Sequence, residues 1–218
     1  MSPSPQKGLK LLTLRTDLYI YISEEIPGFK IRPKKDSPLM RVLSSLLFFN
    51  KGFMNRYITT IYPVIYVPDW WGKHKNMSFS ELGIIVHEYV HLRDRKKLGW
   101  IFNLLYLSPQ IFSLLFFAAF WNLWFLLALL FLLPWPSPGR AWLEYRGYRM
   151  SMAFYYWMKK EKCNIEMLVD EFTGSNYYYM LPFRKFLIKK FNKDYDKIVA
   201  GDLTSELKEL KYIIEKRV

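Results

Sequence analysis

The chain is interrupted by 38 consecutive residues, 98–135, that include no charged side chain. Within this stretch, residues 111–133 carry only Ser113 and Asn122 as clearly polar side chains, so these 23 residues are long enough for one membrane-spanning helix. A soluble protein would have to bury the same stretch against itself or against a partner. Either way, the segments on both sides must fold around an apolar insertion.

The segment that precedes the insertion, residues 78–97, has the composition of a helix and contains H-E-x-x-H at His87, Glu88 and His91. Histidines four residues apart lie on one helical face, where both imidazoles can bind a single Zn²⁺. Zinc lowers the pKa of a bound water to about 7, and Glu88 is placed to take the proton of that water. The alternative is a buried helix whose histidines only form hydrogen bonds.

A third zinc ligand must come from elsewhere, since catalytic zinc sites generally have three protein ligands and one open position. We prefer Glu144, which lies in a helix-compatible segment, residues 141–149, after the insertion. Tyr148 is one turn further on and is predicted to donate its phenol to an oxyanion, with His74 or Arg149 as the alternatives for that role. As a ligand, His74 is less favoured than Glu144, because it lies in a polar loop.

Other readings of these carboxylates remain open. Glu144 could form an ordinary ion pair with an arginine on a helix surface. Asp94 follows His91 by three residues and is better placed to orient a ligand than to bind zinc. The remaining competitors for the third position are Glu161, Asp170 and Glu171.

The motif, the basic residues and apolar stretch that follow it, and W-L-E-Y-R-G-Y at 142–148 resemble the integral-membrane gluzincin metallopeptidases. That group contains the CAAX prenyl proteases and the bacterial heat-shock membrane proteases, and the resemblance covers about residues 56–160. It implies a zincin fold, a zinc cofactor and two hydrophobic helices between the motif and the glutamate-bearing helix. It assigns His87 and His91 as ligands, Glu88 as the base and Glu144 as the third ligand.

A glutamate ligand after the insertion predicts that residues 98–136 form a hairpin. A single crossing would separate His91 from Glu144 by a hydrocarbon layer about 30 Å thick, whereas zinc ligands approach within about 2 Å. We expect the turn between residues 117 and 124. The second leg then covers only about 16–24 Å, so a re-entrant hairpin and two full crossings both remain open.

The net charge of +13 indicates an acidic partner such as anionic lipid, nucleic acid or an acidic substrate. Basic residues on both sides of the insertion place both of its ends, and the active site, on the cytoplasmic face of a membrane. A basic and aromatic segment, residues 177–191, could contact bases or lipid headgroups, but an amphipathic helix that covers the core is simpler. We therefore expect nucleic acid not to be the partner. Cys163 is the only cysteine, which excludes an internal disulfide.

The predicted fold is α+β, a mostly helical zincin-like metallopeptidase domain with a small sheet. The strand predicted at residues 57–67 precedes the motif, where an edge strand could pair with a substrate backbone, and Pro63 suits an edge strand. The other expected elements are a strand at 17–22 and helices at 38–49, 139–162, 165–172, 177–191 and 203–217.

Three parts of the chain are predicted: residues 1–97 with the edge strand and motif helix, the hairpin 98–136, and the helical part 137–218 with the third ligand. The predicted function is a zinc-dependent metalloendopeptidase that hydrolyses polypeptides at or near a membrane. One alternative is a non-catalytic scaffold or assembly protein of the same fold, whose hairpin inserts into a membrane or a large complex. A third possibility is a basic nucleic-acid-binding protein.

Overall fold

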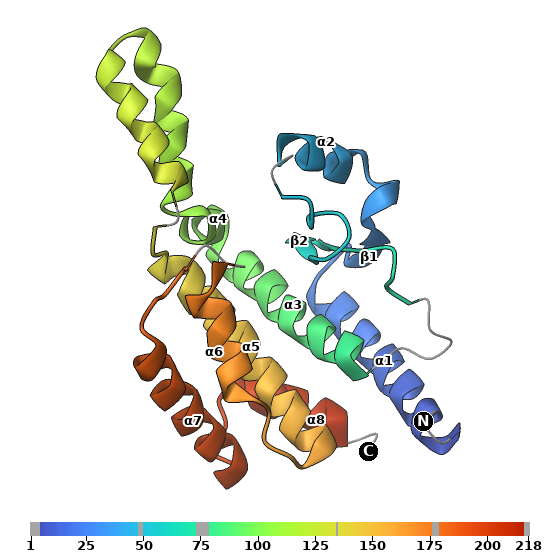
Figure 1. The fold of residues 1–218 in the computed structure, drawn as a ribbon. Coiled ribbons are helices and arrows are strands. Elements are labelled where there is room, and N and C mark those ends of the chain that lie inside the picture. Colours follow the sequence, from blue (N-terminus) through green and yellow to red (C-terminus); the bar gives the residue numbers. More distant parts are fainter. Residues whose placement is uncertain (1–4, 48–49, 73–78, 134, 176–178, 216–218) are drawn as a thin grey trace. The chain divides into compact units, whose positions relative to one another are not determined.

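The structure is a computed structural model of the 218-residue chain and describes residues 5–47, 50–72, 79–133, 135–175 and 179–215. The chain divides into two compact units, one of residues 1–96 and 205–218 and the other of residues 97–204. The described residues are mostly helical and include a small three-stranded sheet (Figure 1). The predicted combination of many helices with a small sheet is therefore confirmed.

The first unit combines the sheet with the helix that carries the H-E-x-x-H motif. In the sheet, the central strand β3 pairs in parallel with β1 and antiparallel with β2. The elements of this unit are α1 (Pro5–Glu25), β1 (Lys30–Pro33), η1 (Lys34–Asp36), α2 (Pro38–Leu46), β2 (Thr59–Ile61), β3 (Val64–Val67), α3 (Phe79–Leu98) and α8 (Ser205–Glu215).

Residues 17–22 are helical, so the strand predicted there is wrong. They lie inside α1, whose side chains Leu14, Leu18 and Ile22 are buried at intervals of four residues. That spacing places the three side chains on one face of a helix. Burial of this face outweighs the β propensity of the aromatic and β-branched residues between them.

Residues 57–67 form a two-stranded hairpin, whereas a single strand was predicted. Antiparallel pairing joins β2 to β3 with Thr60 opposite Ile65, and Pro63 lies in the turn between the strands. Pro63 is therefore a turn residue and not part of an edge strand. The helix predicted at 38–49 is confirmed as α2, and the last two residues of that range lie outside the described residues.

The second unit consists of helices. Its elements are α4 (Trp100–Leu107), the 3₁₀ helices η2 (Gln110–Phe120) and η3 (Leu123–Leu132), α5 (Pro138–Lys159), α6 (Ile165–Thr173) and α7 (Arg184–Ala200). The predicted hairpin is present, since η2 and η3 pack side by side (Figure 1), with the rings of Phe112 and Phe131 centred 5.5 Å apart. Its turn falls at Trp121 and Asn122, inside the expected range.

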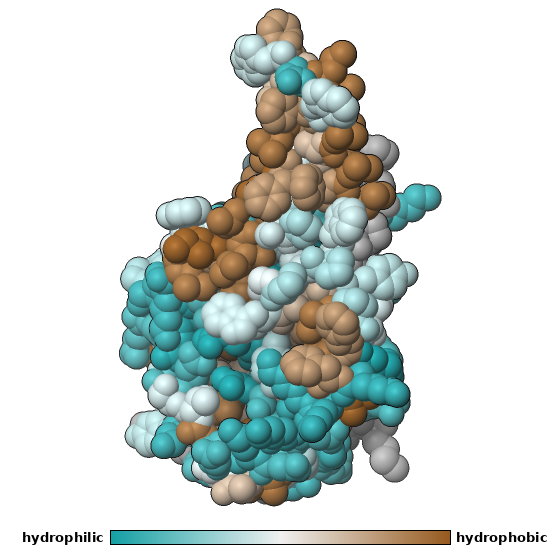
Figure 2. All heavy atoms as spheres, turned by 90° about the vertical axis from the view of Figure 1, so that its left-hand side faces the viewer, coloured by the Kyte–Doolittle hydropathy of each residue, from teal (hydrophilic) through white to brown (hydrophobic). Residues whose placement is uncertain are grey.

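The hairpin keeps its apolar side chains on the outside. Phe120, Trp121 and Trp124 at its tip are 89%, 79% and 77% exposed, and hydrophobic side chains cover the projecting hairpin in Figure 2. None of the described helices is by itself long and apolar enough to cross a membrane. By length and composition, α4 and η2 would together suffice, but they meet at a bend of 90°.

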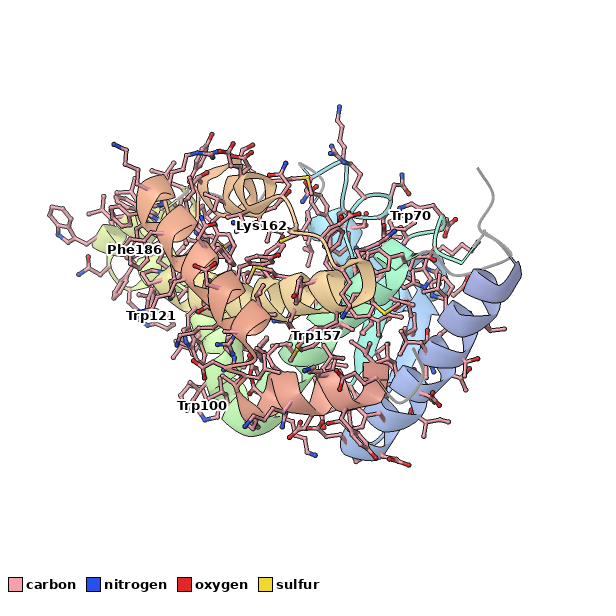
Figure 3. All side chains as sticks on the ribbon, turned by 90° about the horizontal axis from the view of Figure 1, so that it is seen from below. Trp70, Trp100, Trp121, Trp157, Lys162 and Phe186 are labelled. Atoms are coloured by element: carbon pink, nitrogen blue, oxygen red, sulfur yellow. The ribbon has the colours of Figure 1, made fainter. Side chains whose placement is uncertain are left out.

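Helices α5, α6 and α8 match the helices predicted at 139–162, 165–172 and 203–217 within a few residues. Residues 177 and 178 of the helix predicted at 177–191 lie outside the described residues. The observed helix α7 begins at Arg184, shortly after Pro182, which disfavours helical backbone in the residue before it, and it ends at Ala200. Trp157 of α5 is buried among the helices of this unit, whereas Trp100 of α4 and Phe186 of α7 are exposed (Figure 3).

Candidate metal centre

Helix α3 brings His87 and His91 together, as their spacing predicts. Both imidazoles are buried, and their Nε2 atoms lie 3.1 Å apart. Tetrahedral zinc with bonds of about 2.0–2.1 Å would place two ligand nitrogens about 3.3–3.4 Å apart. The two rings therefore present their nitrogens at nearly the separation that a shared zinc ion requires.

Glu88 lies between the two histidines in sequence and contacts the sheet. Its Oε2 accepts a hydrogen bond of 2.6 Å from Oγ1 of Thr60, which belongs to β2. This bond restricts the orientation of a half-buried carboxylate. Thr60 was not identified from the sequence, because nothing in the sequence of a short strand shows which of its side chains will reach the motif helix.

Side-chain contacts within the first unit join α3 to α1 and α8. Arg93 forms ion pairs with Glu25 of α1 at 3.2 Å and with Glu209 of α8 at 2.9 Å. The hydroxyl of Tyr21 donates a hydrogen bond of 3.1 Å to Glu209. Tyr89 donates a short hydrogen bond to Glu25. Burial raises the pKa of Tyr89, and the bond to Glu25 raises it further, so the phenol remains a donor at neutral pH.

Glu144 of α5 is a buried carboxylate, 1% exposed, that accepts a 2.7 Å hydrogen bond from the hydroxyl of Tyr106. Tyr106 belongs to α4, and its carbonyl oxygen accepts a hydrogen bond of 2.7 Å from Nε of the buried Arg140. Gly139 makes the close packing of α4 and α5 possible, because a Cβ there would lie 2.7 Å from the carbonyl oxygen of Leu105. Sequence reasoning missed Tyr106, since it looks like one more aromatic residue of the apolar insertion.

His87, His91 and Glu144 form a group that could hold a metal ion. One imidazole nitrogen from each histidine and one carboxylate oxygen lie within 4.8 Å of one another, and all three residues are buried. Two imidazoles and one carboxylate are a ligand set used by catalytic zinc sites. The donor chemistry and the spacing therefore suit a metal ion.

The competing carboxylates are placed differently. Asp170 is exposed and forms an ion pair with Arg184, and Glu161 is exposed beside the hydroxyl of Tyr155. Glu171 is half-buried, and Asp94 is buried on α3. Within the described ranges of the chain, none of these four joins a group of three potential ligands.

The residues considered for oxyanion stabilisation remain predictions. Tyr148 is half-buried on α5, and its ring packs against Phe172 with centroids 5.5 Å apart. Arg149 follows it on the same helix and is also half-buried. His74 lies outside the described residues.

Comparison with known proteins found no match: no protein-family model fits the chain, and neither a curated protein nor a solved structure is similar to it.

Proposed function

We propose that this protein is a zinc-dependent metalloendopeptidase of zincin architecture that belongs with the integral-membrane gluzincins. The observation that carries the proposal is the H-E-x-x-H helix itself: two buried imidazoles with Nε2 atoms 3.1 Å apart and a glutamate held by Thr60 between them in sequence. Glu144, buried and grouped with both histidines, supports the choice of third ligand.

His87, His91 and Glu144 would hold the zinc ion, which when bound acidifies water and polarises a peptide carbonyl. Glu88 accepts the proton of the attacking water and later donates it to the leaving amine. Thr60 keeps the Glu88 carboxylate in one orientation between these two transfers.

A polypeptide substrate is supported by the position of β2. In the described part of the chain this strand pairs only with β3, so it is an edge strand of the sheet, and Thr60 on it contacts Glu88. An extended peptide added along β2 would form main-chain hydrogen bonds that do not depend on its sequence.

A membrane is the proposed partner of the hairpin, with the active site on the cytoplasmic face. The exposed aromatic side chains at its tip would be unfavourable in water and favourable in lipid. With a 3₁₀ rise of about 2.0 Å per residue, the 11 residues of η2 extend about 22 Å, less than the hydrocarbon core of about 30 Å. The length therefore favours a re-entrant hairpin over two crossings.

Metal analysis tests the site. We expect about one zinc per chain by inductively coupled plasma mass spectrometry of the purified protein. His87→Ala and Glu144→Ala should each lose most of it, because two ligands alone bind zinc weakly. The control Glu161→Ala removes an exposed carboxylate and should keep the metal. Full zinc retention in Glu144→Ala would exclude this residue as a ligand.

Glu88→Gln tests catalysis separately from metal binding. We expect peptide hydrolysis to fall about 10²–10⁴-fold, the usual contribution of a general base, with unchanged zinc content. Hydrolysis is measured on an unstructured quenched-fluorescence peptide. If the wild type binds zinc but does not cleave the peptide, or if Glu88→Gln cleaves it as fast as the wild type does, the chain is instead the non-catalytic scaffold. Retention of nucleic acid by the wild type would favour the third possibility.

A further inference from the structure

Helix α4, which precedes the apolar hairpin in the second unit, has no buried residue. Its side chains are mostly apolar, and Trp100 and Leu107 at its two ends are 69% and 46% exposed. These two residues are seven positions apart, so they lie on the same face of the helix, with the exposed Asn103 between them. The second unit therefore presents a largely apolar helix face that the described residues of the chain do not cover.

A bend of 90° separates α4 from η2, the first leg of the hairpin. Helix α4 ends at Leu107 and η2 begins at Gln110, so the change of direction takes place within two residues. In Figure 2, hydrophobic side chains continue from the projecting hairpin onto the shoulder at its base. If the hairpin enters a membrane along the membrane normal, this angle makes α4 run parallel to the membrane surface.

Two buried residues at the N-terminal end of α5 hold this bend. Arg140 joins its two sides, because Nε donates a hydrogen bond of 2.7 Å to the carbonyl oxygen of Tyr106 in α4 and Nη2 donates one of 3.1 Å to Oε1 of Gln110 in η2. The hydroxyl of Ser137 donates a short hydrogen bond to the carbonyl oxygen of Ser108, inside the bend. Straightening the chain here would leave a buried guanidinium without a partner, which is unfavourable.

Exposed tryptophans occur in the segments that adjoin the base of the hairpin. Trp100 belongs to α4, Trp135 follows η3, and Trp142 lies near the start of α5, which packs against α4. Tryptophan is enriched at the boundary between membrane and water, because its ring is apolar and its N–H is a hydrogen-bond donor. Asn103 favours the same depth, since an exposed amide is unfavourable in the hydrocarbon core but finds partners among the headgroups. The side chains at the base therefore suit the headgroup layer of a membrane.

We propose that α4 is an interfacial helix that lies flat in the headgroup layer, with the hairpin inserted along the membrane normal. This inference rests on the membrane partner given under the proposed function. The competing arrangement is a straightened α4 and η2 that cross the hydrocarbon core together, which their combined length permits. Because Tyr106 of α4 donates a hydrogen bond to Glu144, the flat arrangement places the candidate third ligand within about one helix diameter, roughly 10 Å, of the membrane surface.

Depth measurements at the two ends of α4 test its orientation. The full-length chain with Cys163→Ser, which removes the only cysteine, receives a nitroxide label at Trp100→Cys or at Leu107→Cys. The two positions share a face and are about 10 Å apart along the helix axis. In phospholipid vesicles we expect both labels at the same depth, from electron paramagnetic resonance with oxygen and a nickel chelate as relaxants. A depth difference of about 10 Å would mean that α4 crosses the membrane and would overturn the inference.

Labels at two other positions supply the reference depths. A label at Leu123→Cys, at the exposed tip of the hairpin, should lie deeper than both labels on α4 by up to about 22 Å, the length of the 11 residues of η2. A label at Glu161→Cys, an exposed position just after the far end of α5, should remain in water. A tip label no deeper than the labels on α4 would contradict insertion along the membrane normal.

A binding measurement tests the contact of α4 with lipid without any label. Trp100→Ser should lower vesicle binding about tenfold, because a large aromatic side chain loses its contact with the interface. Trp70→Ser is the matched control, since Trp70 is an exposed tryptophan of the first unit. Binding of Trp100→Ser equal to that of the wild type would refute the contact.

The outcomes separate this inference from the proposed function. If the wild type does not bind vesicles, the proposed membrane partner fails, and the role of α4 fails with it. If the wild type binds but the labels at the two ends of α4 differ in depth, only the orientation of α4 is wrong. Zinc content and peptide cleavage, measured separately, decide the metallopeptidase proposal.

Discussion

At the scale of single residues, the chain buries polar and charged groups that would be unfavourable alone in a protein interior. His87, His91 and Glu144 are buried polar side chains, and Lys34 is a buried cation. Buried polar groups of this kind lower stability unless they have partners, and they are typical of sites where function sets the choice of residue. Removal of such a group is expected to change the stability of the fold, and for a buried charge to raise it.

Lys34→Met should make the fold more stable. Because the folded-state pKa of Lys34 lies below its ordinary value of 10.5, the unfolded chain binds the proton more tightly. The destabilisation caused by burying the Lys34 ammonium is fully present below about pH 8 and disappears as the pH rises to about 10.5. At pH 7 we expect a melting temperature higher by roughly 2–6 °C, measured by calorimetry at pH 7 and pH 10.

The same measurement on Lys35→Met is the control, since an exposed ion pair contributes little. A lower melting temperature of Lys34→Met at pH 7 would mean that the contacts of the Lys34 ammonium with the carbonyl oxygen and the ring of Phe53 stabilise the fold by more than burial of the charge costs.

At the scale of elements, short polar contacts join the helices within each unit. In the first unit, Arg93 of α3 joins α1 through Glu25 and α8 through Glu209. In the second, Tyr106 of α4 orients Glu144 of α5. Helix packing brings the elements together, and these bonds then fix the rotation of the side chains on them.

Tyr106→Phe should weaken metal binding without unfolding the second unit. The substitution keeps the ring and removes the hydroxyl that donates a hydrogen bond of 2.7 Å to Glu144. Loss of a partner that orients a zinc ligand typically lowers metal affinity 10–100-fold, and we expect a change of this size in a zinc-chelator competition assay.

Tyr155→Phe is the matched control for this substitution. Its hydroxyl lies 3.5 Å from a carboxylate oxygen of the exposed Glu161, outside the proposed metal group. Equal zinc affinities of the Tyr106→Phe and Tyr155→Phe variants would show that Tyr106 does not act through a ligand.

At the scale of the whole molecule, an apolar hairpin is inserted into a chain of net charge +13. The hairpin exposes a cluster of large apolar side chains. Surfaces of soluble monomeric proteins rarely carry such a cluster. Positive charge elsewhere in the chain would favour a membrane surface that carries anionic lipid. These properties together predict lipid binding that depends on the hairpin tip and on salt.

Replacement of Trp121 and Trp124 by serine should release the protein from vesicles. Each large aromatic side chain transferred from water to lipid contributes about 1.5–3 kcal/mol, so we expect binding to fall at least about tenfold. Flotation with vesicles of neutral and anionic phospholipids measures the effect, and salt should weaken the anionic case alone. Tyr212→Ser, at an exposed site on α8, is the control. Unchanged flotation of the double variant would exclude the tip as the lipid contact.

Much of the helical organisation could be predicted from the sequence, because periodic burial and helix-ending residues are local signals. The helices that became α2, α3, α5, α6 and α8 follow such signals. The failures are short strands and competing propensities. Residues 17–22 have β-type side chains, yet they extend the buried face of α1. The four residues of β1 are too few to show a pattern, and they become a strand only through pairing with β3.

The sequence by itself determined that two imidazoles lie together, since His87 and His91 are four residues apart and any helix through them places both rings on one face. The sequence also predicted that the apolar insertion turns back, because a glutamate ligand was expected after it. Only the tertiary structure decided which side chains contact the proposed site residues: Thr60 from the edge strand β2, and Tyr106 from the insertion. Such contacts join residues far apart in the chain, and no local pattern encodes them because packing alone brings their atoms within bonding distance.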